Sequence, residues 1–187
     1  MSTAIPVFPE SGKCLLFFFL CQPQCHCHGT DAAGQLAVLK GAIGEIRAIE
    51  ADFCYRTEPN AVPRLYLPSL AGGGLLDVGV YGLHFAAIFL GSAPETLVAL
   101  GHTEHGVDIH TSILMKYKNG AIASITSAIG VEKPETAFIY GTGGWISFPC
   151  FYGPQELTLH TQEGDRRIVK EYLGNGFEEE IIEVCRC

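Results

Sequence analysis

The chain has little positive charge and no long hydrophobic run. Of its 187 residues, 12 are Lys or Arg and 20 are Asp or Glu, so the formal net charge is −8. A protein that binds nucleic acid needs a basic surface for the phosphates, and we therefore expect no nucleic-acid partner. The longest apolar run, from Cys14 to Cys21, is far shorter than the roughly 20 residues that a membrane span needs. We therefore expect no transmembrane helix.

Other absences narrow the class further. The 22 glycines follow no G-X-Y period, which excludes a collagen-like chain. No G-x-G-x-x-G motif links a strand to a helix, so the dinucleotide-binding fingerprint is missing. Charged residues make up only 17% of the chain and hydrophobic residues 48%, which excludes disorder over most of its length.

The eight cysteines indicate the compartment. Four of them crowd one short stretch between Cys14 and Cys27, and the others are scattered singly. The segment before the apolar run carries Glu10 and one lysine, and no small-residue cleavage site follows the run, as a secretory signal would require. We therefore expect a reduced, cytoplasmic setting rather than a disulfide framework.

Periodicity divides the chain into two parts. Residues 1–34 show no sustained period and form an irregular lead-in, whereas regular patterns run through 35–187. A helix is expected to end at Gly41, a long apolar helix over 75–90, and a further helix from Phe177. The predicted strands are 45–56, 96–101, 111–117, 121–129, 136–140, 145–148, 156–160 and 167–172. The pattern predicts an α+β fold in which an open, mainly antiparallel sheet packs on a buried helix.

Three polar side chains stand out in the apolar helix. Asp77, Tyr81 and His84 follow the spacing i, i+4, i+7, which places them on one helical face. A carboxylate, a phenol and an imidazole on one surface are the groups that proton transfer to a substrate hydroxyl needs. The alternative is structural: a capping carboxylate, a core tyrosine and a hydrogen-bonded core histidine.

One segment carries a family resemblance. Gly72-Gly-Gly-Leu-Leu-Asp77-Val-Gly-Val-Tyr81 resembles the GGGxLLDxGxY signature of the Gfo/Idh/MocA oxidoreductases. The resemblance covers residues 38–184 and is greatest toward the branch of dimeric dihydrodiol dehydrogenases and NADP-dependent D-xylose dehydrogenases. Further matching segments are Gly41–Arg47, Gly106–Asp108, Tyr117–Gly120, Ile139–Thr142 and Phe148-Pro149.

The resemblance implies an enzyme of two domains. A Rossmann domain would bind NAD or NADP, and a C-terminal α+β domain would hold a sugar or diol substrate and often the dimer interface. Asp77 and Tyr81 match the family's catalytic pair, with Tyr81 as the acid/base and Asp77 orienting the substrate or tuning Tyr81. Arg64 is a weaker candidate for contact with substrate or cofactor, and His84 is expected near the pocket.

The sequence departs from the family in two ways. The Rossmann half is missing, and with it the glycine loop and the catalytic lysine of a Glu-Lys-Pro motif. The tripeptide Glu132-Lys133-Pro134 follows the helix instead of preceding it, so we assign Lys133 to a surface turn. The C-terminus also stops where the family continues, so we expect a fragment, a truncated gene model or a decayed gene product, catalytically silent when isolated.

Two other readings stay open. The sheet could be a non-catalytic module for homodimerisation or partner binding, with the catalytic pair a relic. A weaker alternative is a small metal-binding protein built on residues 14–28, where Cys21, Cys25, His26, Cys27 and His28 offer thiolate and imidazole ligands. Adjacent residues rarely surround one tetrahedral ion, so we expect no structural zinc. His102 and His105 are expected in an exposed loop rather than as metal ligands.

Overall fold

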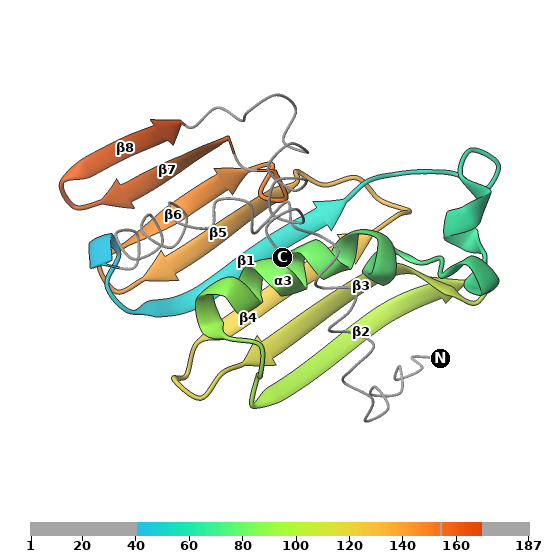
Figure 1. Ribbon diagram of the computed structural model, residues 1–187, viewed down its shortest axis with the longest axis horizontal. Helices are drawn as coiled ribbons and strands as arrows, with labels where there is room; N and C mark the ends of the chain where they lie inside the picture. Colours follow the sequence, from blue (N-terminus) through green and yellow to red (C-terminus); the bar gives the residue numbers. More distant parts are fainter. Residues whose placement is uncertain (1–40, 154, 170–187) are drawn as a thin grey trace, which may run out of the picture.

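The computed structural model describes residues 41–153 and 155–169. They form one sheet of eight strands with one long helix, α3 (Val80–Leu90), lying over one of its faces (Figure 1). A π-helical turn (Leu75–Gly79) leads directly into α3, and two short 3-10 helices (Pro63–Tyr66 and Pro68–Leu70) precede it. The strands are β1 (Ile46–Cys54), β2 (Thr96–Glu104), β3 (Val107–Lys116), β4 (Ile122–Ala128), β5 (Thr136–Gly141), β6 (Gly144–Pro149), β7 (Glu156–Thr161) and β8 (Gly164–Val169).

The sheet is antiparallel except at its centre. Its order is β2-β3-β4-β1-β5-β6-β7-β8, and the β1–β4 pair is parallel. Every other neighbouring pair is antiparallel. The predicted fold class, an open and mainly antiparallel sheet on a buried helix, is confirmed.

The core lies between α3 and the face of the sheet that it covers, which we call the covered face. Helix and sheet approach closely at Gly82, where an added Cβ would lie 2.5 Å from Cγ2 of Ile125. Phe85 and Ala86 of α3 are also buried there. Because successive strand residues alternate between faces, every second residue contributes to this core. The strand residues of the core with at most 2% exposure include Ile49, Ala51, Ala123, Ile125, Ala137, Ile139 and Ile146.

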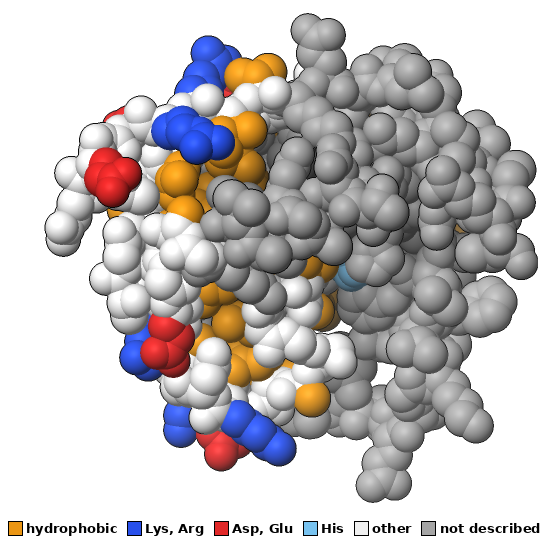
Figure 2. All heavy atoms as spheres, turned by 60° about the vertical axis from the view of Figure 1, so that its left-hand side comes forward, with side chains coloured by type: hydrophobic (Ala, Val, Ile, Leu, Met, Phe, Trp, Pro, Cys, Tyr) orange, Lys and Arg blue, Asp and Glu red, His pale blue; other side chains and the backbone are white. Residues whose placement is uncertain are grey.

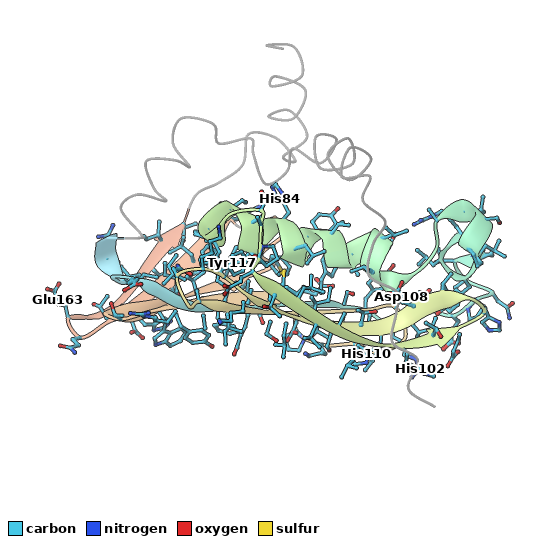
Figure 3. The ribbon with its side chains drawn as sticks, turned by 90° about the horizontal axis from the view of Figure 1, so that it is seen from below. His84, His102, Asp108, His110, Tyr117 and Glu163 are labelled. Atoms are coloured by element: carbon cyan, nitrogen blue, oxygen red, sulfur yellow. The ribbon has the colours of Figure 1, made fainter. Side chains whose placement is uncertain are left out.

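The opposite face, which we call the open face, carries polar groups and exposed apolar ones. Among the residues that the structure describes, no helix lies over it (Figure 3). Trp145 and His160 stack there with ring centroids 3.5 Å apart, and Nδ1 of His160 lies 2.8 Å from Oδ1 of Asp165. Four aliphatic side chains on β2, β3 and β4 are about half exposed or more: Val98, Leu100, Leu114 and Ile122.

The hairpin between β2 and β3 is tighter than expected. The sequence predicts strands over 96–101 and 111–117 with His102 and His105 in a loop, but β2 continues to Glu104 and β3 begins at Val107. His105 and Gly106 both have positive φ (52° and 81°), so they form a two-residue turn whose twist suits a hairpin. His102 is therefore a strand residue, opposite His110, and its side chain is exposed as expected.

The expected helix over 75–90 has the right bounds but begins differently. Its first five residues form a π turn, in which the N–H of Val80 donates to the carbonyl of Leu75. The turn lies tight against β4, because a Cβ on Gly79 would be 2.8 Å from Oγ of Ser127. π turns are rare and often occur at functional sites.

The remaining boundaries differ by small shifts. The gap of 118–120 between two predicted strands is a turn, whereas the gap of 141–144 is shorter than expected, because β5 ends at Gly141 and β6 begins at Gly144. Gly41 and Ala42 are still helical where the sequence predicts an end at Gly41. Strand β8 begins at Gly164 instead of 167. The irregular lead-in, the cysteine cluster and the helix expected from Phe177 lie outside the described residues.

The helical stretch Pro68–Leu90 is apolar. By length and composition alone, the helical stretch Pro68–Leu90 could cross a membrane. In the structure the stretch packs on the covered face through Val78, Phe85 and Ala86. The core helix of a soluble protein has the same composition, so the segment by itself is weak evidence for a membrane span.

Candidate functional site

The predicted catalytic residues lie where β1 ends. The π turn and the first 3-10 helix meet the chain there, just beyond Cys54. The 3-10 helix is anchored by Leu65 and Tyr66, which are buried, and the hydroxyl of Tyr66 donates to the carbonyl of Thr57 (2.9 Å). A Cβ on Gly72 would lie 2.5 Å from the carbonyl oxygen of Leu65, so the glycine run is needed for the loop to close.

Asp77 is held by two partners. The hydroxyl of Tyr55 donates to Oδ2 (2.6 Å), and Nη2 of Arg64 donates to Oδ1 (2.7 Å). The side chain of Asp77 is 19% exposed and that of Arg64 is 53% exposed. Both carboxylate oxygens are therefore engaged, which fixes the rotamer of Asp77 and leaves several guanidinium N–H groups of Arg64 toward solvent.

The charge of Asp77 acts on both partners. Burial raises the pKa of the Tyr55 phenol, and the hydrogen bond and negative charge of Asp77 raise it further. The hydrogen bond and charge of Asp77 also raise the pKa of Arg64. At neutral pH Tyr55 is thus a neutral phenol and Arg64 a cation. Asp77 therefore forms an ion pair with Arg64 and accepts a hydrogen bond from the neutral hydroxyl of Tyr55.

Tyr81 lies in an aromatic group beside this ion pair. Its ring centroid is 5.4 Å from that of Phe53 and 6.1 Å from that of Tyr152, and these two rings stack on each other at 4.4 Å. The hydroxyl of Tyr152 donates to Oε2 of Glu135 (2.8 Å). Tyr81 is half-buried, so its ring is held in place without being sealed in the core.

The structure brings three of the four predicted site residues to one end of β1. Tyr81 packs on Phe53, and Asp77 bonds to Tyr55, which is two residues further along the same side of the chain. Arg64 bonds to Asp77 directly. His84 lies on the outer side of α3, pointing away from the sheet (Figure 3).

Two residues of the site were missed by sequence reasoning. Tyr55 could have been found, because the alternation of β1 places it on the inward side, two residues after Phe53. Tyr152 follows β6 and lies 71 positions after Tyr81, and no local pattern indicates that its ring reaches the helix.

A shallow polar pocket adjoins the site. It has a volume of about 450 Å³ and is lined by Cys54, Tyr55, Arg56, Glu132, Lys133 and Glu135. Lys133 lies in the loop between β4 and β5, as expected of a turn, but its side chain is only 38% exposed and its Nζ is 2.7 Å from Oδ2 of Asp52. Its backbone N–H also donates to the carbonyl of Cys54 (3.2 Å), so Lys133 is tied to the end of β1 by backbone and side chain, which the expected surface turn did not include.

The described residues offer no site for a metal ion or a dinucleotide. Within 41–153 and 155–169, no group of three or more His, Cys, Asp or Glu side chains is placed to hold a metal ion. The same ranges contain one mainly antiparallel sheet and no β-α-β unit that opens a helix with a glycine loop. These residues do not fit a dinucleotide, whose pyrophosphate needs such a helix start.

The ion pair of Arg64 with Asp77 differs from the surface ion pairs. The side chain of Asp77 is only 19% exposed, whereas in the pair of Arg47 with Glu45 both side chains are 54% exposed. On the side drawn in Figure 2, the Lys, Arg, Asp and Glu side chains of the described residues lie above, below and to the left of the hydrophobic ones.

Comparison with known proteins adds sequence relatives. The chain is 34% identical over 132 residues to trans-1,2-dihydrobenzene-1,2-diol dehydrogenase of Mus musculus, which covers 70% of this chain and 38% of that protein. The enzyme of the same name from Danio rerio is 31% identical over 157 residues, which covers 79% of this chain and 46% of that protein. The chain thus spans less than half the length of these relatives.

Solved structures share the fold. The 3-ketoreductase KijD10 of Actinomadura kijaniata, in complex with NADP and TDP-benzene, matches with a TM-score of 0.74 at 24% identity, over 91% of this chain and 52% of that chain. Levoglucosan dehydrogenase, in complex with NADH and levoglucosan, matches with a TM-score of 0.66 at 21% identity, over 79% of this chain and 49% of that chain. The family model of the GFO/IDH/MocA C-terminal domain matches residues 35–147, and the chain therefore belongs to the GFO/IDH/MocA family through that domain.

Proposed function

We propose that this chain is the substrate-binding domain of an NAD- or NADP-dependent oxidoreductase that acts on the CH–OH group of a sugar or a trans-dihydrodiol. The observation that carries the proposal is the fixed Asp77, bonded to Tyr55 and Arg64 at the end of β1 where Tyr81 also lies. The names of the relatives, a diol dehydrogenase and a levoglucosan dehydrogenase, support the substrate class.

Each residue has a distinct role in this proposal. Tyr81 exchanges the proton of the substrate hydroxyl, for which a phenol held by neighbouring rings is suited. Asp77 orients the site through its two hydrogen bonds, and Arg64 offers its remaining N–H groups to substrate oxygens. The dinucleotide would supply the hydride acceptor, and the described residues form no site for it. We therefore expect the isolated chain to be catalytically silent.

The first experiment is a cofactor titration. Purified chain is titrated with NADPH and NADH while the fluorescence of the cofactor is followed. We expect no saturable binding up to millimolar cofactor, because a glycine loop is missing from the described fold. Saturable binding in the micromolar range would contradict the proposal of a substrate-binding domain without its own cofactor site, and Tyr81→Phe would then be assayed for oxidation of xylose and of a diol.

The second experiment tests the substrate site itself. Ligand-observed NMR with D-xylose and with a trans-dihydrodiol is compared between the wild type, Tyr81→Phe and Arg64→Met. We expect weak binding to fall at least severalfold in both variants, and to be unchanged in Glu163→Gln, which alters the exposed β7–β8 turn. Equal binding by all four proteins would place the ligand elsewhere.

A second candidate function is homodimerisation through the open face. Val98, Leu100, Leu114 and Ile122 form an exposed apolar group there, which a monomer has no need to keep. Sedimentation equilibrium at micromolar concentration decides between a dimer and a monomer. A cytoplasmic location remains part of the proposal; both cysteines of the described ranges, Cys54 and Cys150, are free, as a reducing compartment would require.

A further inference from the structure

The start of the π turn is capped from another strand. The N–H of Leu75 donates to Oδ2 of Asp108 on β3 (2.7 Å), and the hydroxyl of Thr111 donates to the same oxygen (3.1 Å). The residue before the turn, Gly74, has no side chain that could do this. The first N–H groups of a helix need an acceptor, and here a carboxylate 33 positions away supplies one.

The glycine run makes room for that carboxylate. Gly73 has a φ of +114°, and a Cβ at this position would lie 2.3 Å from Oδ1 of Asp108. A Cβ on Gly74 would lie 3.5 Å from Oδ2 of Asp108 and 3.4 Å from Cα of Ala128. The second glycine of the motif that carries the family resemblance, Gly73, therefore leaves the space that the carboxylate of Asp108 occupies, whereas a side chain at Gly74 would only reach ordinary contact with it.

Burial disfavours the charged form of the Asp108 carboxyl group. Its burial raises its pKa, and the hydrogen bonds from Leu75 and Thr111 oppose that effect. A carboxylate is also favoured at a helix start, where the aligned peptide dipoles are positive. The carboxylate of Asp108 holds the peptide of Leu75 in place. The N–H of Leu75 donates to Asp108, and the carbonyl of Leu75 accepts from the N–H of Val80.

Asp77 lies within this fixed turn, two residues after Leu75. Its N–H donates to the carbonyl of Gly73 (3.2 Å), so the peptides that flank it are set by the segment that Asp108 touches. We propose that Asp108 is a positioning residue, which fixes the π turn so that the carboxylate of Asp77 meets Arg64 and Tyr55. The consequence for substrate binding rests on the proposed function, whereas the geometry can be tested without it.

The test uses a signature of the Arg64–Asp77 pair. A guanidinium that donates to a carboxylate exchanges its N–H protons slowly, and these are followed by ¹H–¹⁵N NMR of the full chain. Asp77→Ala supplies the reference for a lost pair, and backbone amide signals of β5 and β6 report whether the sheet is intact. Asp165→Asn and Asp165→Ala, on exposed β8, are the matched controls.

Two variants of Asp108 distinguish positioning of the Asp77 carboxylate from stabilisation of the whole fold. Asp108→Asn keeps an oxygen that can accept from Leu75, and we expect it to retain the slow exchange of Arg64. Asp108→Ala removes the acceptor, and we expect exchange at least tenfold faster with the sheet signals intact. Slow exchange in Asp108→Ala, or fast exchange in both variants, would overturn the proposal.

A milder variant covers the case in which Asp108→Ala does not fold. Thr111→Val keeps the shape of the buried Thr111 side chain and removes its bond to Asp108. We expect exchange at Arg64 to rise about threefold, and an unchanged rate would overturn the proposal. Substrate binding is measured separately on the same proteins: if the wild type binds no sugar or diol, the proposed function fails while the positioning result stands.

Discussion

Both faces of the sheet carry aliphatic side chains, but those of one face are buried and those of the other are exposed. On the covered face, Ile49 and Ile139 are fully buried under α3 and its neighbours. On the open face, Leu100 is 64% exposed and Leu114 is 53% exposed. Strand β3 shows the contrast within one element, because Ile113 is buried while its neighbour Leu114 is not. The covered face therefore provides stability, whereas the apolar groups of the open face add little to it and form a surface that a partner could cover.

The largest effect is expected on the covered face. Ile139→Ala removes a fully buried side chain from β5 and should lower the free energy of unfolding by about 2–5 kcal/mol, since it loses burial and leaves a cavity. Urea unfolding followed by circular dichroism measures it. Leu100→Ala on the open face is the control, with an expected change of about 0.5 kcal/mol or less. Similar losses in both variants would abolish the distinction between the faces.

The thiol of Cys54, at the end of β1 on the open side, is buried and should therefore react differently from the exposed thiol of Cys150. Burial raises the pKa of its thiol from 9.0 to about 11, so its thiolate fraction near pH 8 is about a hundredfold lower than that of an ordinary thiol. We expect iodoacetamide to modify the exposed Cys150 and to leave Cys54 largely intact, as read by peptide mass spectrometry. Between pH 7 and 10 the rate at Cys54 should rise about tenfold per pH unit without levelling, because the pKa lies above that range. A plateau below pH 9 would refute the assignment.

An intermediate effect is expected at the site. Asp77→Ala leaves the hydroxyl of Tyr55 and the guanidinium of Arg64 without their acceptor, and should cost about 1–2 kcal/mol of stability. The cost is limited because Arg64 is half exposed and water can replace the carboxylate. A double-mutant cycle with Tyr55→Phe should show coupling between the two positions. Strict additivity would mean that the short hydrogen bond contributes nothing.

The smallest effect on stability is expected for Leu100→Lys on the open face. The side chain is largely exposed, so the free energy of unfolding should change by about 0.5 kcal/mol or less. If this face pairs two copies of the chain, the charge should shift sedimentation equilibrium from dimer toward monomer. The exposed Glu163→Gln serves as control. Wild type that is monomeric at high micromolar concentration would remove homodimerisation from the candidate functions.

Much of the fold could be predicted from local patterns, because buried and exposed residues alternate along most of its strands. Ala123 and Ile125 give the period-2 signal of β4, and Asn119-Gly120 gives its turn. The hairpin turn at His105-Gly106 was not predicted, because histidine is not among the residues that usually indicate a turn with positive φ. The π turn was not predicted either, since it depends on Asp108 and Ser127, which lie on other strands.

The candidate site could be predicted in part. Asp77 and Tyr81 were found from spacing and resemblance, and the structure places both at the end of β1, but their catalytic roles stay predictions. The spacing also predicted His84 on the same helical face as Asp77 and Tyr81. In the structure His84 instead lies on the outer side of α3, away from the sheet. The alternation of β1 places Tyr55 on the inward side, but its hydrogen bond to Asp77, 22 positions later, depends on how the loop between them folds.

The central position of β1 has a consequence for how the chain folds. Ala48 of β1 pairs with Ile122 of β4 and Tyr140 of β5, which lie 74 and 92 positions later in the chain. Closing such long loops is slow, so the hairpins β2–β3–β4 and β5–β6–β7–β8 should form first and β1 should join them last. On a ribosome, β1 emerges before both of its partner strands, and its two edges stay unpaired until β4 and β5 have been made. During that interval the strand is exposed to pairing with other chains, and a product that stops before β5 keeps one of its edges open permanently.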